Sequence, residues 1–301
     1  QNSEAPGAES YKLWGFIQPQ YVRNEGGEVS GIAAPAGLAA YNGQNPAFNQ
    51  VGPDLNSRDK LQIFRARPGV RGVIPGTDEK ISYFVLAELG NNALTRERSA
   101  IFTDATVSFN YISGARVRVG LGRLPIGEEA MLGEPAMDYI NFSNVTDSLL
   151  NERFVTSYVN TSRTHAPVLG VPFKQSKVVG AVGAIRDVGI EVYDWFTHEQ
   201  WEYAYALMAS QGNGVSFDRD ANSGNRDVTG RLQVSYVFGG KGPKREDATL
   251  YTWRQSGDRL YSGNNYSRVR EGLGAKYLQG KLRLSGEIIR ARGMIYMGSN
   301  P

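Results

Sequence analysis

The chain contains no cysteine, only two histidines and no long apolar run. Without thiols it has no disulfides and no thiolate metal ligands, which is compatible with a secreted bacterial protein that does not depend on cross-links. His165 and His198 stand apart in the sequence, so a zinc or iron site is not expected. No segment approaches the roughly 18 consecutive apolar residues that define a membrane-spanning helix, so helical membrane proteins are excluded.

The lack of such a run does not exclude a membrane. Hydrophobic residues make up 41% of the 301 residues, and the mean hydropathy is -0.38. A membrane β-strand alternates apolar lipid-facing residues with polar ones, so its average hydropathy is mildly hydrophilic. The 36 glycines and 16 tyrosines are typical of the turns and interfacial aromatic girdles of a membrane barrel.

The clearest strand pattern covers residues 104–111, DATVSFNY. Polar residues at even positions alternate there with apolar residues at odd positions, a period that a helix cannot sort onto two faces. Residues 115–121, ARVRVGL, repeat the alternation after a short ISG turn. The two segments therefore predict a β-hairpin.

The same alternation recurs along the chain, and no stretch has a persuasive helical period. Eleven strands are readable, at residues 11–22, 61–73, 80–89, 104–111, 115–121, 188–196, 201–210, 228–238, 249–254, 267–278 and 281–289. We see no linker and no internal repeat, so residues 1–301 form a single domain. The pattern predicts the all-β class, as a transmembrane antiparallel β-barrel of about 16 strands in the full protein.

The connections between these strands separate into two groups if the first strand runs outward from the periplasm. The inner connections, 74–79, 112–114, 197–200, 239–247 and 279–280, are all shorter than the outer ones, 24–58, 90–101, 123–185, 212–226 and 256–266. Short periplasmic turns and long external loops are typical of outer-membrane barrels, whereas a soluble sandwich or propeller has no physical reason to sort its loops. The pattern therefore predicts a protein of the bacterial outer membrane.

Arginine dominates the basic residues, because 24 Arg and 9 Lys stand against 30 acids, for a formal net charge of +3. In a barrel the polar face lines a water-filled lumen, since lipid cannot satisfy polar groups. A basic lumen favours small anions as permeants, and the guanidinium fork suits oxyanions. Alternatively, these arginines pair with acids across a wet wall. The residues predicted to line an anion path are Arg65, Arg67, Arg71, Arg116, Arg118, Arg231, Lys281 and Arg283.

The connection 123–185 is too long for an idle loop. As the third external loop it is a candidate constriction loop that folds into the pore, and a cap outside the pore is the alternative. Its first half is acidic and bases follow, so acid and base on opposing walls would create a transverse field. Apolar residues that could anchor it are Met131, Leu132, Tyr139, Ile140 and Phe142, and the candidate constriction residues are Glu128, Glu129, Asp138 and Arg153.

Five segments carry a family resemblance that spans nearly the whole chain. They are GFIQPQYVRNE (15–25), LQIFRARPGVRGVIPG (61–76), the hairpin at 103–130, the mid-chain pair 201–214 and 226–236, and the late hairpin 272–289. In this order they resemble the phosphate- and polyphosphate-selective porin family and its wider porin relatives. The resemblance implies homotrimers of sixteen-stranded barrels, surrounded by outer-membrane lipid and lipopolysaccharide. It also implies an arginine ladder that conducts anions, with Arg65, Arg67, Arg71, Arg116 and Arg118 as the matching residues.

Two features depart from the family pattern. The third external loop is acidic in its first half and lacks a tight lysine cluster, so we expect a general or mildly anion-selective pore rather than strict phosphate specificity. The chain ends on MIYMGSNP instead of a strand with a terminal aromatic residue, so we expect that a C-terminal portion is missing.

The polar start, QNSEAPGAES, is typical of a mature N-terminus after cleavage of a leader.

Other functions have weaker signals. His165 beside Ser162, and His198 near Asp194, could be imagined as catalytic pairs, but isolated loop histidines are usually polar surface, so we expect no enzyme. Segment 217–227 faintly resembles a calcium-binding loop but lacks the final Glu of an EF-hand. The only cofactor that we consider is therefore calcium, bound weakly by an external loop. No nucleic-acid partner is expected. The alternative function is a barrel sheath around a partner protein, or a structural outer-membrane protein.

Overall fold

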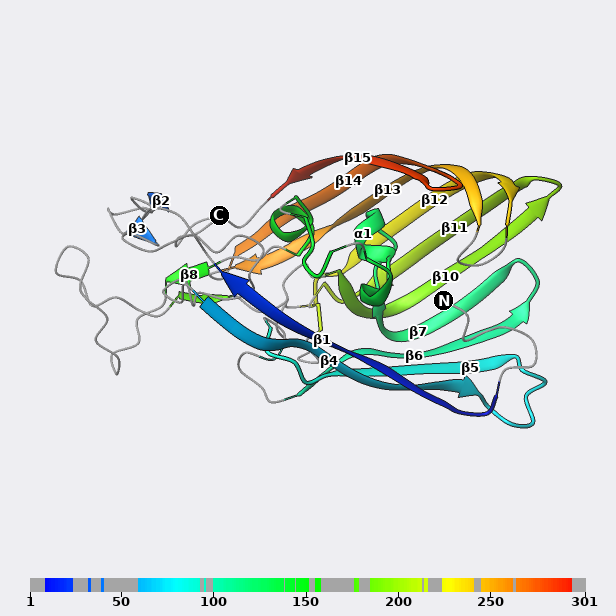
Figure 1. Cartoon of the computed structure of the whole chain (residues 1–301), viewed down its shortest axis with the longest axis horizontal. Coiled ribbons are helices and arrows are strands. Elements are labelled where there is room, and N and C mark those ends of the chain that lie inside the picture. The colour runs from blue at the N-terminus through cyan, green and yellow to red at the C-terminus, as the bar shows by residue number, and fades with distance from the viewer. Residues whose placement is uncertain are drawn as a thin grey trace.

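An eleven-stranded antiparallel sheet is the main feature of the protein (Figure 1). The computed structural model describes residues 9–23, 32–33, 39–40, 59–92, 95, 100–137, 139–143, 145–151, 155–157, 176–178, 185–212, 214–215, 224–240, 245–261 and 264–293. In the sheet the strands follow the order β1-β4-β5-β6-β7-β10-β11-β12-β13-β14-β15. Each strand thus pairs with its neighbours along the chain, an up-and-down arrangement that antiparallel hairpins can connect.

All eleven predicted strands are present, so the prediction of an all-β antiparallel fold is confirmed. They are β1 (Lys12–Arg23), β4 (Asp59–Val73), β5 (Ile81–Glu88), β6 (Ile101–Ile112), β7 (Ala115–Arg123), β10 (Arg186–His198), β11 (Trp201–Ser210), β12 (Asp227–Gly239), β13 (Glu246–Tyr261), β14 (Asn264–Gln279) and β15 (Leu282–Arg292). The described residues also contain two small two-stranded sheets, β2 (Ile32–Ala33) with β3 (Ala39–Ala40), and β8 (Val155–Ser157) with β9 (Ser176–Val178).

The two faces of the large sheet have the reverse polarity of a soluble protein. Arg65 and Arg67 on β4 are each only 3% exposed, whereas Leu61 on the same strand is 79% exposed. On the paired strand β1, Ile17 is 66% exposed. The pairing of β1 with β4 shifts register between Gln18 and Pro19, so the part of β4 with Leu61 turns the opposite face to that of Arg65 and Arg67. The sheet thus buries a polar face and exposes an apolar one.

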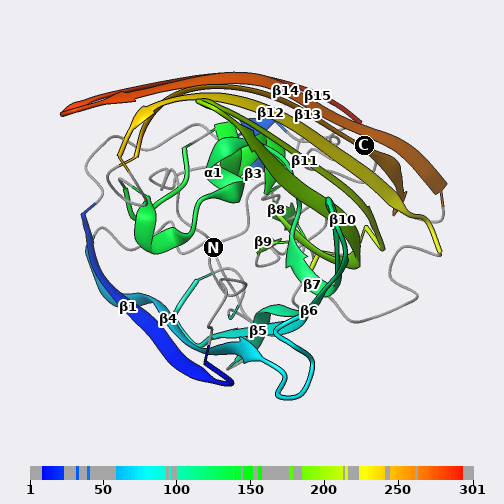
Figure 2. The same ribbon diagram turned by 90° about the vertical axis from the view of Figure 1, so that its right-hand side faces the viewer.

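The sheet bends around a segment that follows β7, as Figure 2 shows. This segment contains α1 (Glu128–Met131), a 3-10 turn (Glu134–Ala136) and a π-helical turn (Thr146–Leu150), three short elements that the strand pattern did not predict. We call residues 124–137, 139–143 and 145–151 the inserted loop. The described residues contain no helix that is long and apolar enough to span a membrane.

A small apolar core joins the inserted loop to the concave face of the sheet. Ile126 and Leu150 are fully buried and cluster with Trp253 of β13. Of the predicted anchors, Phe142 lies in this core, whereas Tyr139 is 80% exposed. Burial of these side chains away from water holds the loop inside the curve of the sheet.

Tight connections gather at one end of the sheet, including 113–114, 199–200 and 280–281, and the opposite end carries 24–58 and 124–185. The prediction that every inner connection is shorter than every outer one is wrong for the β13–β14 hairpin. Its connection, predicted as 256–266, is only 262–263, because each strand is 16 residues long and pairing continues to the end. At about 3.4 Å per residue such a strand is ~54 Å long, against ~25 Å for the apolar band of a membrane barrel. The part of β13 and β14 that extends beyond the apolar band can therefore remain paired as strands instead of forming a loop.

Candidate functional site

The candidate site is the polar concave face and the inserted loop that rests on it. Strand register defines this face, because directly paired residues lie on the same side. Ser82 of β5 pairs with Ser108 of β6, Ser108 pairs with Arg118 of β7, and Arg118 pairs with Glu191 of β10. Arg118 Nε donates to Glu191 Oε2 at 2.8 Å. Polar side chains thus run continuously across four strands.

Glu134 is the main connection between the inserted loop and the wall. Its carboxylate is 2% exposed and pairs with Arg67 of β4 at 2.6 Å and with Arg186 of β10 at 3.0 Å. It also pairs with Arg123 at the end of β7. Burial alone would raise the pKa of Glu134, but the three guanidinium groups, Arg123 foremost, hold it well below its usual range. Glu134 is therefore stabilised as an anion, and it joins three strands to the loop.

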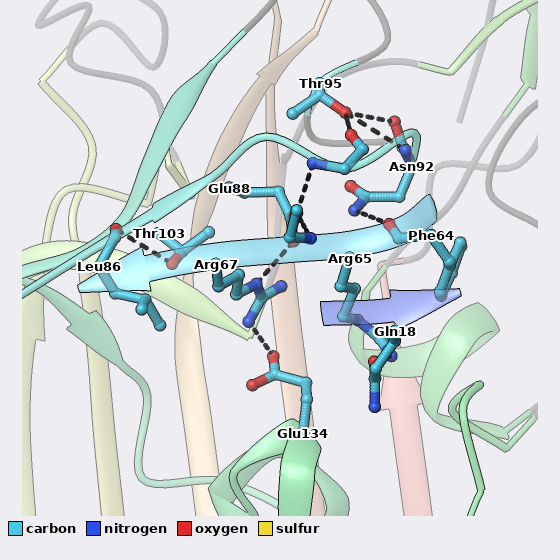
Figure 3. A network of polar contacts seen from close by, with 12 residues as sticks. Gln18, Phe64, Arg65, Arg67, Leu86, Glu88, Asn92, Thr95, Thr103 and Glu134 are labelled. Carbon is cyan, nitrogen blue, oxygen red and sulfur yellow. Dashed lines mark hydrogen bonds and ion pairs between the residues drawn. The ribbon is translucent and has the colours of Figure 1, made fainter. Parts of the chain in front are cut away.

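The arginines around Glu134 have further acidic partners on the wall. Arg67 Nε lies 2.6 Å from Glu88 Oε2, and the Glu88 side chain is fully buried (Figure 3). Arg186 Nε lies 3.1 Å from Asp104 Oδ2. Buried charges persist only when they are paired and hydrogen-bonded, and these ones are.

A second connection forms where α1 meets the late strands. Arg231 Nη2 of β12 lies 3.0 Å from Glu128 Oε2, and Lys276 Nζ of β14 lies 2.7 Å from Glu128 Oε1. Glu287 of β15 accepts hydrogen bonds from the Glu128 backbone N–H at 3.1 Å and from Trp253 Nε1 at 2.6 Å. The acidic start of the loop therefore faces the basic part of the wall.

Two further arginines hold the loop through its backbone carbonyls. Arg65 Nη1 donates to Ile140 O at 2.5 Å and also to Gln18 Oε1 of β1 at 2.7 Å. On the same concave face but in the late strands, Arg270 Nε of β14 donates to Leu149 O at 2.8 Å. The loop is thus attached to early, middle and late strands.

The predicted pore-lining residues occupy different positions in the structure. Arg65, Arg67, Arg118 and Arg231 lie on the concave face in the contacts given above, and Arg116 lies 3.5 Å from Asp194. Arg71 is half-buried on the face that carries Arg67, and Arg283 pairs with Leu278 near the tight-turn end. Lys281 was expected on a strand, and this is corrected: it is exposed in the two-residue turn between β14 and β15, because β15 begins at Leu282.

The predicted constriction residues are only partly described. Glu128 contacts the wall, whereas Glu129 points to its own loop and accepts a hydrogen bond from Ser143 Oγ at 2.8 Å. Asp138 and Arg153 lie outside the described residues, as does His165. Glu128 and Glu129, the two predicted acids that the structure describes, are thus engaged in contacts with the protein instead of facing an open passage.

Several wall residues were missed by the sequence argument. Arg268 and Arg270 are buried on the concave face of β14, and Arg268 Nη1 lies 3.5 Å from Asp227 Oδ2. The signal was available, since both residues have the same parity as Lys276 on a strand whose alternation was recognised. Glu134 was predicted only as one of the acids in the first half of the loop, because nothing local distinguishes a loop acid that will be buried against the wall.

Comparison with known proteins gives no family assignment. No family model matches the chain, and no curated protein matches it. Among solved structures it is similar to an anion-selective porin from Comamonas acidovorans, at 14% identity and a TM-score of 0.40, covering 93% of this chain and 78% of that one. It is also similar to Salmonella typhi OmpF in complex with daunomycin, at 9% identity and a TM-score of 0.40, covering 97% and 81%. A mutant porin of Rh. blastica matches at 12% identity and a TM-score of 0.29, covering 79% and 88%. Likeness at these scores does not place the chain in a family.

The side chains of the concave face can hydrate solutes and pair with their charges. Within the described part of the chain, no group of three or more His, Asp or Glu side chains is placed to hold a metal ion. Asp194, considered above as a partner of His198, lies against Arg116. The concave face instead presents buried hydroxyls, carboxylates and guanidiniums, the kinds of groups that line aqueous passages in proteins.

Proposed function

We propose that this protein is a pore of the bacterial outer membrane that passes small hydrophilic solutes, prefers anions and catalyses no reaction. The observation that carries the proposal is the reversed polarity of the sheet, with arginines buried on the concave face and leucines and isoleucines exposed on the convex one. An exposed apolar face suits hydrocarbon, and a polar concave face suits water.

An aromatic belt supports the membrane location. Trp201 and Tyr236 pack edge to face with ring centroids 5.0 Å apart, and Phe238 and Tyr277 follow with centroids 5.6 Å apart. These residues lie near the tight turns at one end of the sheet. Amphipathic rings concentrate at membrane–water interfaces, so this end suits the periplasmic interface.

The anion preference is supported by bases that remain after the ion pairs are formed. Most arginines of the concave face have acidic partners, so they add little net potential. Lys12 of β1 and Arg71 of β4 pair in register on the face that carries Arg67, and within the described residues neither has an acidic partner. Two unneutralised cations beside an aqueous path favour anions over cations.

Reversal potential in a planar lipid bilayer tests this proposal. We expect the purified protein to conduct in a KCl gradient with a chloride preference. A unit charge attracts chloride and repels potassium by about 1 kcal/mol each at 4 Å in water, so Arg71→Gln should lower the chloride-to-potassium permeability ratio by up to about thirtyfold. Lys281→Gln removes the same charge from an exposed turn and is the matched control, expected to leave the ratio unchanged. A wild-type protein that does not conduct would end the proposal, and a wild-type ratio that does not favour chloride would end its anion part. Equal ratios in all three proteins would refute the role of Arg71 in the preference.

Phosphate specificity and assembly form the finer part of the proposal. Replacing chloride with phosphate in the same bilayer distinguishes a general anion pore, which we expect, from a phosphate-selective one. In the described sheet β1 and β15 are edge strands, and lipid does not tolerate unpaired strand edges. The functional barrel therefore has further strands between them, sixteen in all by the porin resemblance, and assembles as a homotrimer. Native mass spectrometry of the detergent-purified protein tests the trimer.

The inserted loop disfavours a sheath around a partner protein. It is held on the concave face by Glu128, Glu134, Arg65 and Arg270, in contacts with early, middle and late strands. A lumen that contained a partner would need this space. We propose instead that the loop narrows the pore.

A further inference from the structure

Three aromatic side chains of the early strands lie together on the polar concave face. Trp14 and Phe16 belong to β1, and Phe84 belongs to β5. The Trp14 ring stacks with Phe84 at a centroid distance of 5.6 Å and an interplanar angle of 24°. It also stacks with Phe16 at 6.4 Å and 29°. We call these three side chains the aromatic patch.

Strand register places the aromatic patch on the face that lines the proposed pore. Phe16 pairs with Arg67 of β4, whose guanidinium contacts the inserted loop, and directly paired residues share a face. Trp14 lies two residues from Phe16 on the same strand, so it shares that face. Phe84 pairs with Arg71, which lies four residues from Arg67 on β4. The register shift in the pairing of β1 with β4 lies outside this segment.

The exposure of the aromatic patch distinguishes it from two other rings of the concave face. Tyr251 and Trp253 of β13 are each 2% exposed and belong to the apolar core beneath the inserted loop. Trp14, Phe16 and Phe84 lie outside that core and are half-buried. Apolar surface that stays in contact with water costs free energy, and a patch of it inside a polar wall marks a surface for binding.

A glycine lets the Trp14 ring lie close against the strands. Gly69 of β4 pairs in register with Trp14 of β1 and with Leu86 of β5. A Cβ atom at this position would lie 3.1 Å from Trp14 Nε1 and 2.8 Å from Leu86 Cδ1. The indole nitrogen is buried over the glycine, so the accessible part of the Trp14 ring is its carbon surface. This surface suits an aromatic ligand better than a hydrogen-bonding one.

Two cations adjoin the aromatic patch on its tight-turn side. Arg71 pairs in register with Lys12 of β1 and with Phe84 of β5, so it lies between them. In the part of the chain that the structure describes, neither Lys12 nor Arg71 has an acidic partner. The Trp14 row lies two residues away along the strands, a step of about 6.8 Å. The two positive charges are therefore one row from the middle of the patch.

The other side of the aromatic patch is electrically balanced. Arg67 lies there, and Glu88 and Glu134 neutralise its guanidinium (Figure 3). Glu134 belongs to the inserted loop, so the loop meets the wall at this row. A ligand on the patch thus has its negative group toward Lys12 and Arg71, on the side of the loop that faces the tight turns.

The two parts of this site select one class of ligand. Aromatic rings stack on planar aromatic partners, and unneutralised guanidinium and ammonium groups bind carboxylates. A carboxylate attached directly to an aromatic ring spans the single-row step between Trp14 and Arg71. We propose that the aromatic patch, Lys12 and Arg71 bind an aromatic carboxylate beside the inserted loop. This site rests on the proposed pore function and names a class of solute for it.

Isothermal titration calorimetry of the detergent-purified full chain at low ionic strength tests the site. The probes are benzoate, acetate, which has the charge without the ring, and benzylamine, which has the ring with the opposite charge. We expect the wild type to bind benzoate more tightly than either. Trp14→Leu/Phe84→Leu should weaken benzoate binding by at least about fivefold, because two ring contacts are lost, and leave acetate binding unchanged. Phe102→Leu removes an exposed ring from the convex face and is the matched control, expected to bind as wild type.

A second variant keeps the test independent of how well the aromatic variant folds. Lys12→Gln/Arg71→Gln retains the rings, and it should weaken benzoate and acetate binding alike and abolish the preference for benzoate over benzylamine. Unchanged benzoate affinity in either double variant overturns the site, because benzoate then binds elsewhere. Equal wild-type affinity for benzoate and acetate overturns it as an anion site that does not recognise rings. Equal affinity for benzoate and benzylamine overturns it as an apolar surface that does not select charge.

Bilayer conductance of the wild type separates the failure of this site from the failure of the pore proposal. A protein that conducts but does not bind benzoate keeps the pore and loses the site. Conversely, a protein that binds benzoate in detergent without conducting ends only the pore proposal.

Discussion

The contact between Glu134 and three arginines makes a quantitative prediction about the inserted loop. The substitution Glu134→Gln preserves the shape of the side chain and removes its charge. Arg67, Arg123 and Arg186 come from β4, β7 and β10, so one substitution weakens the attachment of the loop to three strands at once. We expect the barrel to remain folded and the loop to detach more often.

The size of the effect follows from what each arginine retains. Arg67 keeps Glu88 and Arg186 keeps Asp104, whereas Arg123 keeps the backbone carbonyls of Ala130 and Leu132 in the loop. Removing one partner of a buried pair costs about 3–5 kcal/mol, and the two retained pairs place the substitution at the low end. At about 1.4 kcal/mol per tenfold change, ~3 kcal/mol corresponds to a roughly hundredfold larger population of detached loop.

Single-channel recording and hydrogen exchange measure this population. Glu134→Gln should increase current noise or brief conductance steps, and amides of α1 should exchange faster. The matched control is Glu129→Gln, which removes the same charge from the same loop, where the Glu129 carboxylate accepts hydrogen bonds from the exposed Ser143. If Glu134→Gln and Glu129→Gln have equal noise and equal amide protection, the loop is not held by the Glu134 cluster and the reasoning is refuted.

Three more predictions follow from the same structure. The three guanidiniums depress the pKa of Glu134. The stabilisation of the loop by Glu134 is therefore complete above the ordinary pKa of about 4.3 and is lost as pH falls through the lower pKa of the folded protein. Current noise should stay constant from about pH 8 to about pH 5 and rise only in stronger acid. Ile17→Arg places a charge on the convex face and should reduce the free energy of unfolding in lipid vesicles by about 2–4 kcal/mol, measured by denaturant titration with Ile17→Leu as control; an unchanged midpoint would show that this face does not meet lipid. Ile126→Ala should leave a cavity under the loop that costs about 2–5 kcal/mol locally, with faster exchange in α1 but not in β12; uniform loss across both would contradict a local core.

Much of the fold was predictable because its rule is local. Alternation with period two can be recognised within each segment, and all eleven predicted segments are strands. The same rule assigns Arg65, Arg67 and Arg118 to one face without knowledge of the partners of those strands. It failed at β13 and β14, where polar external residues continue the pairing, because hydrogen bonding between two strands depends on their partner as well as on their own composition.

The partners of the site residues depended on tertiary structure. Arg67 meets Glu134 only because β4 and the inserted loop come together across the bend of the sheet, and Glu128 meets Lys276 for the same reason. Such pairs are far apart in the sequence, so no local pattern contains them. Their formation also changed the chemistry of the concave face, since the arginines that the sequence predicts as a basic ladder are largely neutralised by acids. Sequence alone determined which side chains share a face within each regular strand segment, because side-chain direction alternates along a strand, and it missed the register shift in β4, which depends on pairing with β1. Tertiary structure decided which of those charges remain unpaired, because neutralisation requires two groups to meet in space.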